Sequence, residues 1–154
     1  MKVLFVCTGN TCRSPLAEVM ARKLARERGL ADVTFGSAGT GAYNGASASE
    51  GSMLVGVERR LDLSRHRSRT LTPELVAESD LILGMSDQHV ENAVELGGAG
   101  KTFLLDDFAT SGKSSNWVTD PFGQDLRTYR SAADDIERQV ALAVERIASR
   151  GLPP

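Results

Sequence analysis

The start of the chain places a polar loop between a predicted strand and a predicted helix. Four consecutive apolar residues, Val3 to Val6, are typical of a buried parallel strand. A loop from Cys7 to Ser14 follows, and Pro15 then opens a helical spacing of apolar residues with Ser14 as the expected N-cap. Free backbone N–H groups and the positive end of a helix dipole surround such a loop, and both favour an anion. The sequence therefore predicts a phosphate-binding loop at the end of the first strand.

Two side chains of this loop, Cys7 and Arg13, carry the expected chemistry. Loop amides, a helix N-terminus and a guanidinium all favour the thiolate of Cys7, which makes Cys7 the expected nucleophile. The planar guanidinium of Arg13 can bind two phosphoryl oxygens at once and bind them more tightly as charge builds during transfer. Gly9 permits the tight turn of the loop. The alternative, a Cys7 that is only a small buried apolar residue, leaves the coincidence of glycine, arginine and helix cap unexplained.

A second motif, Thr-Asp-Pro-Phe-Gly at residues 119–123, lies far along the chain. When a phosphoryl group moves to sulfur, an acid on a loop can protonate the leaving group, and the same carboxylate can then activate water. Asp120 is the candidate for both steps. Asp-Pro alone is an ordinary turn sequence, so this interpretation depends on its pairing with the Cys7 loop. The surrounding stretch 106–125 lacks a packing pattern, as expected of a functional or mobile loop.

The rest of the chain alternates short apolar runs with helical spacings, which is typical of a parallel sheet with helices on both faces. We therefore expect an α/β fold: a single three-layer domain over residues 1–150 with a four-stranded parallel sheet, and a frayed tail at 151–154. A last helix carries an apolar stripe from Leu126 to Ile147. The predicted strands are 2–7, 32–36, 80–84 and 102–105, the predicted helices before the last are 14–28, 47–60, 72–78 and 86–96, and the predicted N-caps include Thr72 and Ser86.

Composition, charge and cysteine content fit one globular domain in a reducing compartment. The 154 residues are 41% apolar and 25% charged, and the net charge of -2 argues against a nucleic-acid partner. No signal peptide or membrane-spanning run is expected, and two cysteines in one reactive loop fit a cytoplasmic protein, which we expect to be a monomer. Arg65, Arg67 and Arg69 form a basic cluster near the expected rim of the site, either as a solvated face or to attract anionic substrates. His66 and His89 lie at no recognisable metal-ligand spacing, so neither a metal nor a cofactor is expected.

The two motifs together resemble the low-molecular-weight protein tyrosine phosphatase family, and the likeness runs through nearly the whole chain. The resemblance implies a phosphatase domain over residues 1–150, with Cys7 as nucleophile, Arg13 as phosphate clamp and Asp120 as general acid. No metal is needed, because the loop amides and Arg13 supply the positive charge. The other parts of the sequence that match are the Ser-Ala-Gly-Thr-Gly stretch at 37–41, the His-Arg segment at 66–72 and the Asp-Leu-Ile strand at 80–82.

The resemblance also implies supporting roles around the loop. Asn10 and Ser14 are expected to hold the loop and the thiolate by hydrogen bonds. His66 is expected to brace this network from outside, and the alternative for His66 is a plain surface histidine in a basic run. By resemblance the phosphate-binding loop consists, besides Cys7 and Arg13, of Thr8, Gly9, Asn10, Thr11, Cys12 and Ser14.

The family has branches, and this sequence has features of two. Thr11 and the run from Asp120 towards Tyr129 resemble the bacterial protein arginine phosphatases, because a threonine narrows the pocket and offers a hydroxyl to a planar guanidine. Tyr43 resembles the tyrosine branch, in which an aromatic residue nearby forms the wall of a ring-binding slot. Phe122 suits either substrate, since aromatic faces accept both a ring and a guanidinium. Phosphoarginine on proteins is the favoured substrate and phosphotyrosine the alternative, in which case Thr11 is a plain loop residue.

The chemistry of the loop disfavours two other activities. Arsenate reductases share the fold, but their disulfide relay needs more cysteines than Cys7 and Cys12, so that reaction is disfavoured. Cys12 is instead expected to form a reversible disulfide with Cys7 after oxidation, which prevents irreversible damage. A different class of protein, a phosphate-sensing module without turnover, needs neither a nucleophile nor an acid. The presence of both Cys7 and Asp120 speaks against it.

Overall fold

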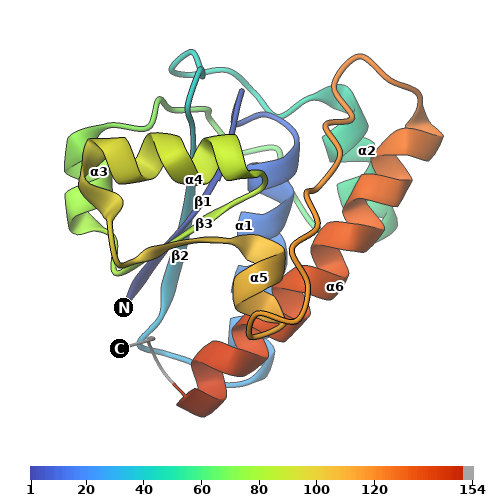
Figure 1. The fold of residues 1–154 in the computed structure, drawn as a ribbon. Coiled ribbons are helices and arrows are strands. Elements are labelled where there is room, and N and C mark those ends of the chain that lie inside the picture. The colour runs from blue at the N-terminus through green and yellow to red at the C-terminus, as the bar shows by residue number, and fades with distance from the viewer. Residues whose placement is uncertain (151–154) are drawn as a thin grey trace.

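The computed structural model describes residues 1–150, whose four strands form one parallel sheet in the order β2-β1-β3-β4. Strand β1 lies in the interior of the sheet and pairs with β2 on one side and β3 on the other (Figure 1). The predicted α/β fold with a four-stranded parallel sheet is confirmed. The strands are β1 (Lys2–Cys7), β2 (Thr34–Gly39), β3 (Leu81–Gly84) and β4 (Thr102–Leu104).

Helices cover both faces of this sheet, as the three-layer prediction requires (Figure 1). The helices are α1 (Arg13–Glu27), α2 (Glu50–Glu58), α3 (Pro73–Glu78), α4 (Asp87–Ala93), the π-helical turn η1 (Val94–Gly98), α5 (Leu105–Ala109) and α6 (Leu126–Arg150). On one face, α6 packs against α1, α2 and α5. On the other face, α3 and α4 pack with η1. Within residues 1–150 no helix is both long and apolar enough to cross a membrane.

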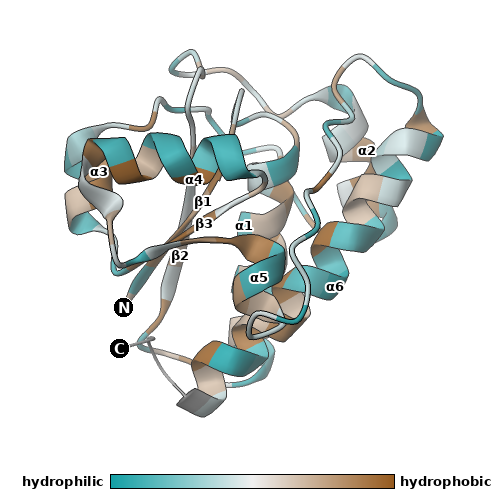
Figure 2. Ribbon diagram, in the orientation of Figure 1, coloured by the Kyte–Doolittle hydropathy of each residue, from teal (hydrophilic) through white to brown (hydrophobic). Residues whose placement is uncertain are grey.

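The apolar run in β1 is continuous because this strand is buried on both faces. Val3 and Phe5 belong to the larger core, which includes side chains of α1 and α6, whereas Leu4 and Val6 belong to the smaller core beside α3. Figure 2 shows the hydrophobic colouring concentrated on the strands and on the inward sides of the helices. Burial on both faces holds β1 inside the sheet, so that the loop after Cys7 emerges at the carboxyl edge, where ligands bind in open α/β sheets.

Two predicted element starts near the site were wrong. Helix α1 begins at Arg13 with Cys12 in the N-cap position, one residue earlier than predicted, and Ser14 does not cap it. The hydroxyl of Ser14 instead contacts the thiol of Cys7. Strand β2 was predicted at 32–36, but it spans Thr34–Gly39, because its backbone pairing with β1 begins at Thr34 and continues to Gly39.

The other N-cap predictions had mixed outcomes. Thr72 caps α3, since its side chain accepts a hydrogen bond from the backbone N–H of Leu75. Ser86 occupies the N-cap position of α4 but makes no capping hydrogen bond. Helix α2 was predicted from residue 47 and begins at Glu50, where the side chain of Ser49 caps it.

The stretch 106–125 is less irregular than predicted, because its first residues belong to the short helix α5. Leu105 and Phe108 of α5 are buried in the larger core, and Arg146 of α6 lies over the ring of Phe108 and donates to its carbonyl. The helical pattern predicted at 86–96 continues into the π-helical turn η1. The predicted fraying at 151–154 lies outside the described residues.

Candidate active site

The loop after β1 is held against the neighbouring chain by backbone hydrogen bonds. The N–H of Thr40 donates to the carbonyl of Cys7 at 2.9 Å, and the N–H of Gly41 donates to the carbonyl of Thr8 at 3.0 Å. Gly39 lies against the backbone of this loop. A Cβ added at Gly39 would overlap the carbonyl oxygen of Thr8 and lie 2.9 Å from the backbone nitrogen of Asn10. Only glycine allows this approach, which explains why the Ser-Ala-Gly-Thr-Gly stretch matters to the site.

Asn10 organises the inside of the loop. Its backbone is left-handed, with φ of 54°, and the residue is fully buried. The side-chain amide donates to the hydroxyls of Ser14 at 2.8 Å and Ser37 at 2.9 Å, and its oxygen accepts from the backbone N–H of Arg69 at 2.9 Å. His66 Nε2 lies 2.6 Å from the carbonyl of Asn10, and because a carbonyl only accepts, this ring nitrogen carries the hydrogen. The predicted contacts of Asn10 and His66 are thus present.

Among the described residues, the thiol of Cys7 has one hydrogen-bonding partner. Its Sγ lies 2.8 Å from the hydroxyl of Ser14. Since this hydroxyl already accepts from Asn10, its hydrogen is free to donate to sulfur. The hydroxyl of Ser14 can thus hold the Cys7 sulfur in place by a donated hydrogen bond.

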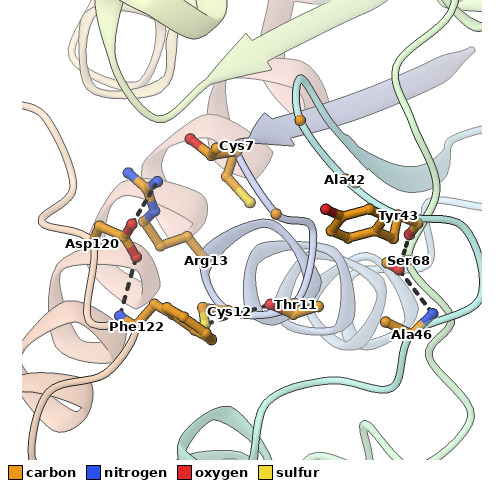
Figure 3. Close-up of a pocket in the computed structure, with 13 residues that line it drawn as sticks. Cys7, Thr11, Cys12, Arg13, Ala42, Tyr43, Ala46, Ser68, Asp120 and Phe122 are labelled. Carbon is orange, nitrogen blue, oxygen red and sulfur yellow. Dashed lines mark hydrogen bonds and ion pairs between the residues drawn. The ribbon is translucent and has the colours of Figure 1, made fainter.

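Arg13 is buried, with 6% of its surface exposed, and it points towards the pocket next to Cys7 (Figure 3). One terminal nitrogen donates to the carbonyl of Val118 at 3.0 Å, and the other lies 3.7 Å from the carboxylate of Asp120. The Nε atom has no hydrogen-bond partner within residues 1–150. A buried N–H without a partner is costly, so this edge of the guanidinium is suited to an oxyanion.

Asp120 lies at the mouth of the pocket, on the opposite side of Cys7 from Tyr43 (Figure 3). Its side chain is 54% exposed, and one carboxylate oxygen accepts from the backbone N–H of Phe122 at 3.1 Å. The carboxylate is therefore oriented by its own turn and by Arg13, yet it remains open to water and to a leaving group.

The pocket around Cys7 has a volume of about 350 Å³. Thr11 is partly buried and lines this pocket, and Tyr43 and Phe122 line it with 87% and 67% of their surfaces exposed, as expected at a rim. The hydroxyl of Ser68 donates to the carbonyl of Tyr43 and accepts from the N–H of Ala46, which secures the rim segment (Figure 3). The structure thus brings together every candidate substrate-contacting residue of the sequence prediction.

His89 also reaches this site, although the sequence suggested no role for it. Its Nε2 lies 2.8 Å from the hydroxyl of Thr8, and its Nδ1 lies 2.9 Å from the hydroxyl of Ser86. Burial, and secondarily the positive charge of Arg13, lowers the pKa of His89 to about 4, while Asp120 raises it slightly. The imidazole is therefore neutral at physiological pH. Its position just beyond the carboxyl end of β3 was the available clue.

The second cysteine of the loop belongs to a separate hydrogen-bonded group. Cys12 Sγ lies 3.2 Å from the hydroxyl of Ser49 and 3.4 Å from that of Tyr129, and the two hydroxyls lie 3.2 Å apart. Burial and the hydrogen bond to Cys12 raise the pKa of Tyr129 to about 12. Both Cys7 and Cys12 are free thiols and both are buried.

The basic cluster does not lie where it was predicted. Arg65, Arg67 and Arg69 were expected near the rim of the site, but none of them lines the pocket around Cys7. They line a separate hollow on the other side of their segment. The positive charge at the site comes instead from Arg13, the loop amides and the N-terminus of α1. Within the described residues, no group of three or more His, Cys, Asp or Glu side chains could hold a metal ion.

A thiol and a buried guanidinium on a strand, loop and helix, with a carboxylate opposite, have the arrangement that cysteine-dependent phosphoryl transfer requires. Residues 2–150 match the family described as low molecular weight phosphotyrosine protein phosphatase, and the chain belongs to this family. It is therefore a phosphatase, a hydrolase that acts on phosphoproteins.

Individual relatives are similar along almost the whole chain. The protein-arginine-phosphatase of Bacillus subtilis is 36% identical over 151 residues, which cover 95% of this chain and 98% of the relative. The low molecular weight protein-tyrosine-phosphatase PtpB of Staphylococcus haemolyticus is 36% identical over 88% of this chain and 92% of its own. A solved structure of the YwlE arginine phosphatase, a mutant with a phosphorylated active-site serine, superposes with a TM-score of 0.91 at 33% identity and covers 97% of both chains. Relatives of both branches thus match.

Proposed function

We propose that this protein hydrolyses phosphoarginine on proteins through a phosphocysteine intermediate. The observation that carries the choice of substrate is Thr11, whose short hydroxyl-bearing side chain lines the Cys7 pocket. Relatives from Bacillus subtilis and Geobacillus stearothermophilus that are named protein-arginine-phosphatases match 95% of this chain at 36% identity, which supports the same choice.

In the first half-reaction, the thiolate of Cys7 attacks phosphorus in line with the leaving group. The loop amides and Arg13 bind the three equatorial oxygens, and the unpartnered Nε–H of Arg13 is a donor available to them. The phosphorus–nitrogen bond breaks as the sulfur–phosphorus bond forms. Asp120, protonated in this step, donates its proton to the departing guanidine nitrogen.

In the second half-reaction, water hydrolyses the phosphocysteine. The carboxylate of Asp120, now ionised, accepts a proton from the water that attacks phosphorus, and the thiolate of Cys7 leaves. Ser14 donates a hydrogen bond to this sulfur, which stabilises it as a leaving group. Asp120 can serve both steps because its side chain is half exposed and lines the same pocket as Cys7.

The physical basis for phosphoarginine is the polarity that Thr11 gives to the lining of the pocket. The N–H groups of a guanidine need a hydrogen-bond acceptor. Thr11 supplies a hydroxyl oxygen, where a bulkier apolar residue would supply none. Phe122 at the rim can stack on the guanidinium.

The test is the ratio of kcat/KM on matched phosphoarginine and phosphotyrosine peptides, with variants that separate the two properties of Thr11. Thr11→Ser keeps the hydroxyl, Thr11→Val keeps the shape without the hydroxyl, and Thr11→Ile removes the hydroxyl and adds bulk to the pocket lining. We expect wild type and Thr11→Ser to prefer phosphoarginine and Thr11→Ile to lose that preference. Removal of one hydrogen bond to a charged group predicts an intermediate loss of about 10-fold in Thr11→Val. A wild-type preference for phosphotyrosine would refute the proposal.

Phosphotyrosine is the second candidate substrate, and one observation favours it. Tyr43 lies at the rim with its ring almost fully exposed, where it can form one wall of a slot for a phenyl ring. If phosphotyrosine is the substrate, Tyr43→Ala lowers kcat/KM on the phosphotyrosine peptide and leaves activity on phosphoarginine nearly unchanged.

The alternative that the protein only senses phosphate, without turnover, is tested separately by Cys7→Ser. An enzyme with the proposed nucleophile loses turnover in this variant but still binds inorganic phosphate, because Arg13 and the loop amides remain. A protein that only senses phosphate has no turnover to lose in the wild type.

The pair of buried thiols supports reversible protection of the nucleophile. Peroxide oxidises the Cys7 thiolate to a sulfenic acid and is itself reduced, and the thiol of Cys12 then displaces water to form a disulfide. Mass spectrometry after mild peroxide treatment tests this step, and independently oxidised sulfurs without a bridge would refute it.

A cytoplasmic location and a monomeric state complete the proposal: two unbridged thiols fit a reducing compartment, and light scattering tests the oligomeric state.

A further inference from the structure

Four arginines gather around a hollow that the proposed reaction does not use. Its volume is about 400 Å³, and it lies between α1, the edge of β2 and the segment 62–69. Both the basic cluster of the sequence and one arginine of α1 contribute to it. Its ionisable lining residues are Glu18, Arg22, Asp62, Arg65, His66, Arg67 and Arg69.

The charge of the hollow is positive, in a chain whose net charge is -2. Four guanidinium groups face two carboxylates, and the carboxylates are already engaged. Glu18 forms an ion pair with Arg22 at 2.7 Å, and Asp62 accepts from the backbone N–H of Ser64 at 2.9 Å. Arg65 makes no hydrogen bond or ion pair within the described part of the chain, and Arg67 bonds only to backbone carbonyls. The surplus of positive charge and free N–H donors is suited to an oxyanion.

The hollow lies directly behind the active-site loop. The segment 62–69, which forms one wall of the hollow, also makes two hydrogen bonds to Asn10. His66 donates to the backbone carbonyl of Asn10, and the backbone N–H of Arg69 donates to its side-chain oxygen. Ser37, which also lines the hollow, accepts from the amide of Asn10 and donates to Glu18 at 2.6 Å. A ligand that ties the segment to α1 therefore acts on the residue that organises the phosphate-binding loop.

We propose that this hollow is a second oxyanion site, which binds a phosphate group and is coupled to the active-site loop through Asn10. Two sources share that chemistry: inorganic phosphate, which the proposed reaction releases, and the phosphate ester of a small molecule, for which the hollow leaves room. Binding of phosphate at the hollow does not depend on the proposed function, whereas the effect of this binding on turnover rests on it.

Binding is tested by titrating the reduced protein with inorganic phosphate and following backbone amide resonances at constant ionic strength. Gly36 and Leu63 report on the hollow, and Gly9 and Gly41 report on the active-site loop. We expect saturable shifts in both groups of amides, with two different dissociation constants. Methylphosphonate, which mimics a phosphate ester, is the second probe, and tighter binding of it at Gly36 and Leu63 would identify esters as the better ligand.

The variant Arg65→Ala/Arg67→Ala should abolish the shifts at the hollow and retain those at the active-site loop. Arg28→Ala/Arg138→Ala is the matched control, because it removes two positive charges from exposed ion pairs with Glu145 and Asp135, away from the hollow. Shifts confined to the active-site loop, or equal shifts at the hollow in both double variants, would overturn the site.

Coupling is tested by kcat at saturating phosphoarginine peptide, where competition by phosphate at Cys7 disappears. Inorganic phosphate should change kcat about 5-fold, the lower end of the range for coupled sites, and Arg65→Ala/Arg67→Ala should remove the change. An unchanged kcat together with saturable shifts at the hollow would overturn the coupling but keep the site. Absence of any turnover would instead count against the proposed function.

Discussion

The buried neutral imidazole of His89 predicts a specific loss of stability in mild acid. The folded protein holds the pKa of His89 at about 4, against 6.5 for an ordinary histidine, mainly because the ring is buried and secondarily because Arg13 is positive. Between pH 6.5 and pH 4 the unfolded chain therefore binds a proton at this ring that the folded chain does not. The free energy of unfolding falls as the pH decreases through this window.

The size of the effect follows from the difference between the two pKa values of His89. The full difference corresponds to about 3 kcal/mol, at roughly 1.4 kcal/mol for each pH unit. At pH 5 the unfolded histidine is almost fully protonated and the folded one almost fully neutral, so about 2 kcal/mol of stability is lost relative to pH 7. This loss is large beside the 5 to 15 kcal/mol that is typical of a small domain.

Urea unfolding at pH 7 and pH 5 tests this reasoning, with His89→Gln beside the wild type. Glutamine cannot titrate but can bond to Thr8, and every other titrating group is common to both proteins. We expect His89→Gln to be less stable than wild type at pH 7 and to lose about 2 kcal/mol less between pH 7 and pH 5. If the two proteins lose the same stability between these pH values, the imidazole is not held neutral by the fold.

Three further changes have expected outcomes. Asp120→Asn should lower kcat by about 10²- to 10⁴-fold with little change in phosphate binding, and an unchanged rate would place the acid elsewhere. Gly39→Ala should cost about 1 to 3 kcal/mol in urea unfolding and distort the loop, whereas Gly41→Ala, whose Cβ meets Thr8 only at 3.7 Å, should cost much less; equal losses would refute the packing argument. Arg13→Lys should raise KM and lower kcat, because lysine cannot bind two oxygens from a planar fork; retained activity would refute bidentate binding.

The contrast between Ser14 and Thr72 shows where local sequence rules suffice. Ser14 and Thr72 each lie at the start of a helix and are each followed by proline. Both were therefore predicted as N-caps. Thr72 caps its helix, and its hydroxyl makes no other hydrogen bond within residues 1–150. The hydroxyl of Ser14 bonds to Cys7 and Asn10 instead, so the helix starts one residue earlier. The competing contact is tertiary, and a local pattern does not contain it.

Among the residues that come to the site from distant parts of the sequence, some were predicted and others were not. Asp120 was found because Asp-Pro-Phe belongs to a motif with a chemical purpose. His89 was missed because its partner Thr8 lies 81 positions away, and a single histidine after Ser86 has no distinctive spacing. The basic cluster was recognised as a cluster but placed on the wrong side of its segment, since sequence does not reveal which face of an extended segment meets the pocket.

The sequence by itself determined the strand, the phosphate-binding loop and the following helix, because Val3 to Pro15 are contiguous and backbone geometry alone joins them into an anion site. It also determined the alternation that makes a parallel sheet with two covered faces. Only the tertiary structure decided which distant groups complete the loop: His66 and Arg69 on Asn10, and His89 on Thr8. These contacts depend on how the strands are ordered and how the loops at their carboxyl ends pack, and that order is set by burial of the whole core rather than by any short stretch of chain.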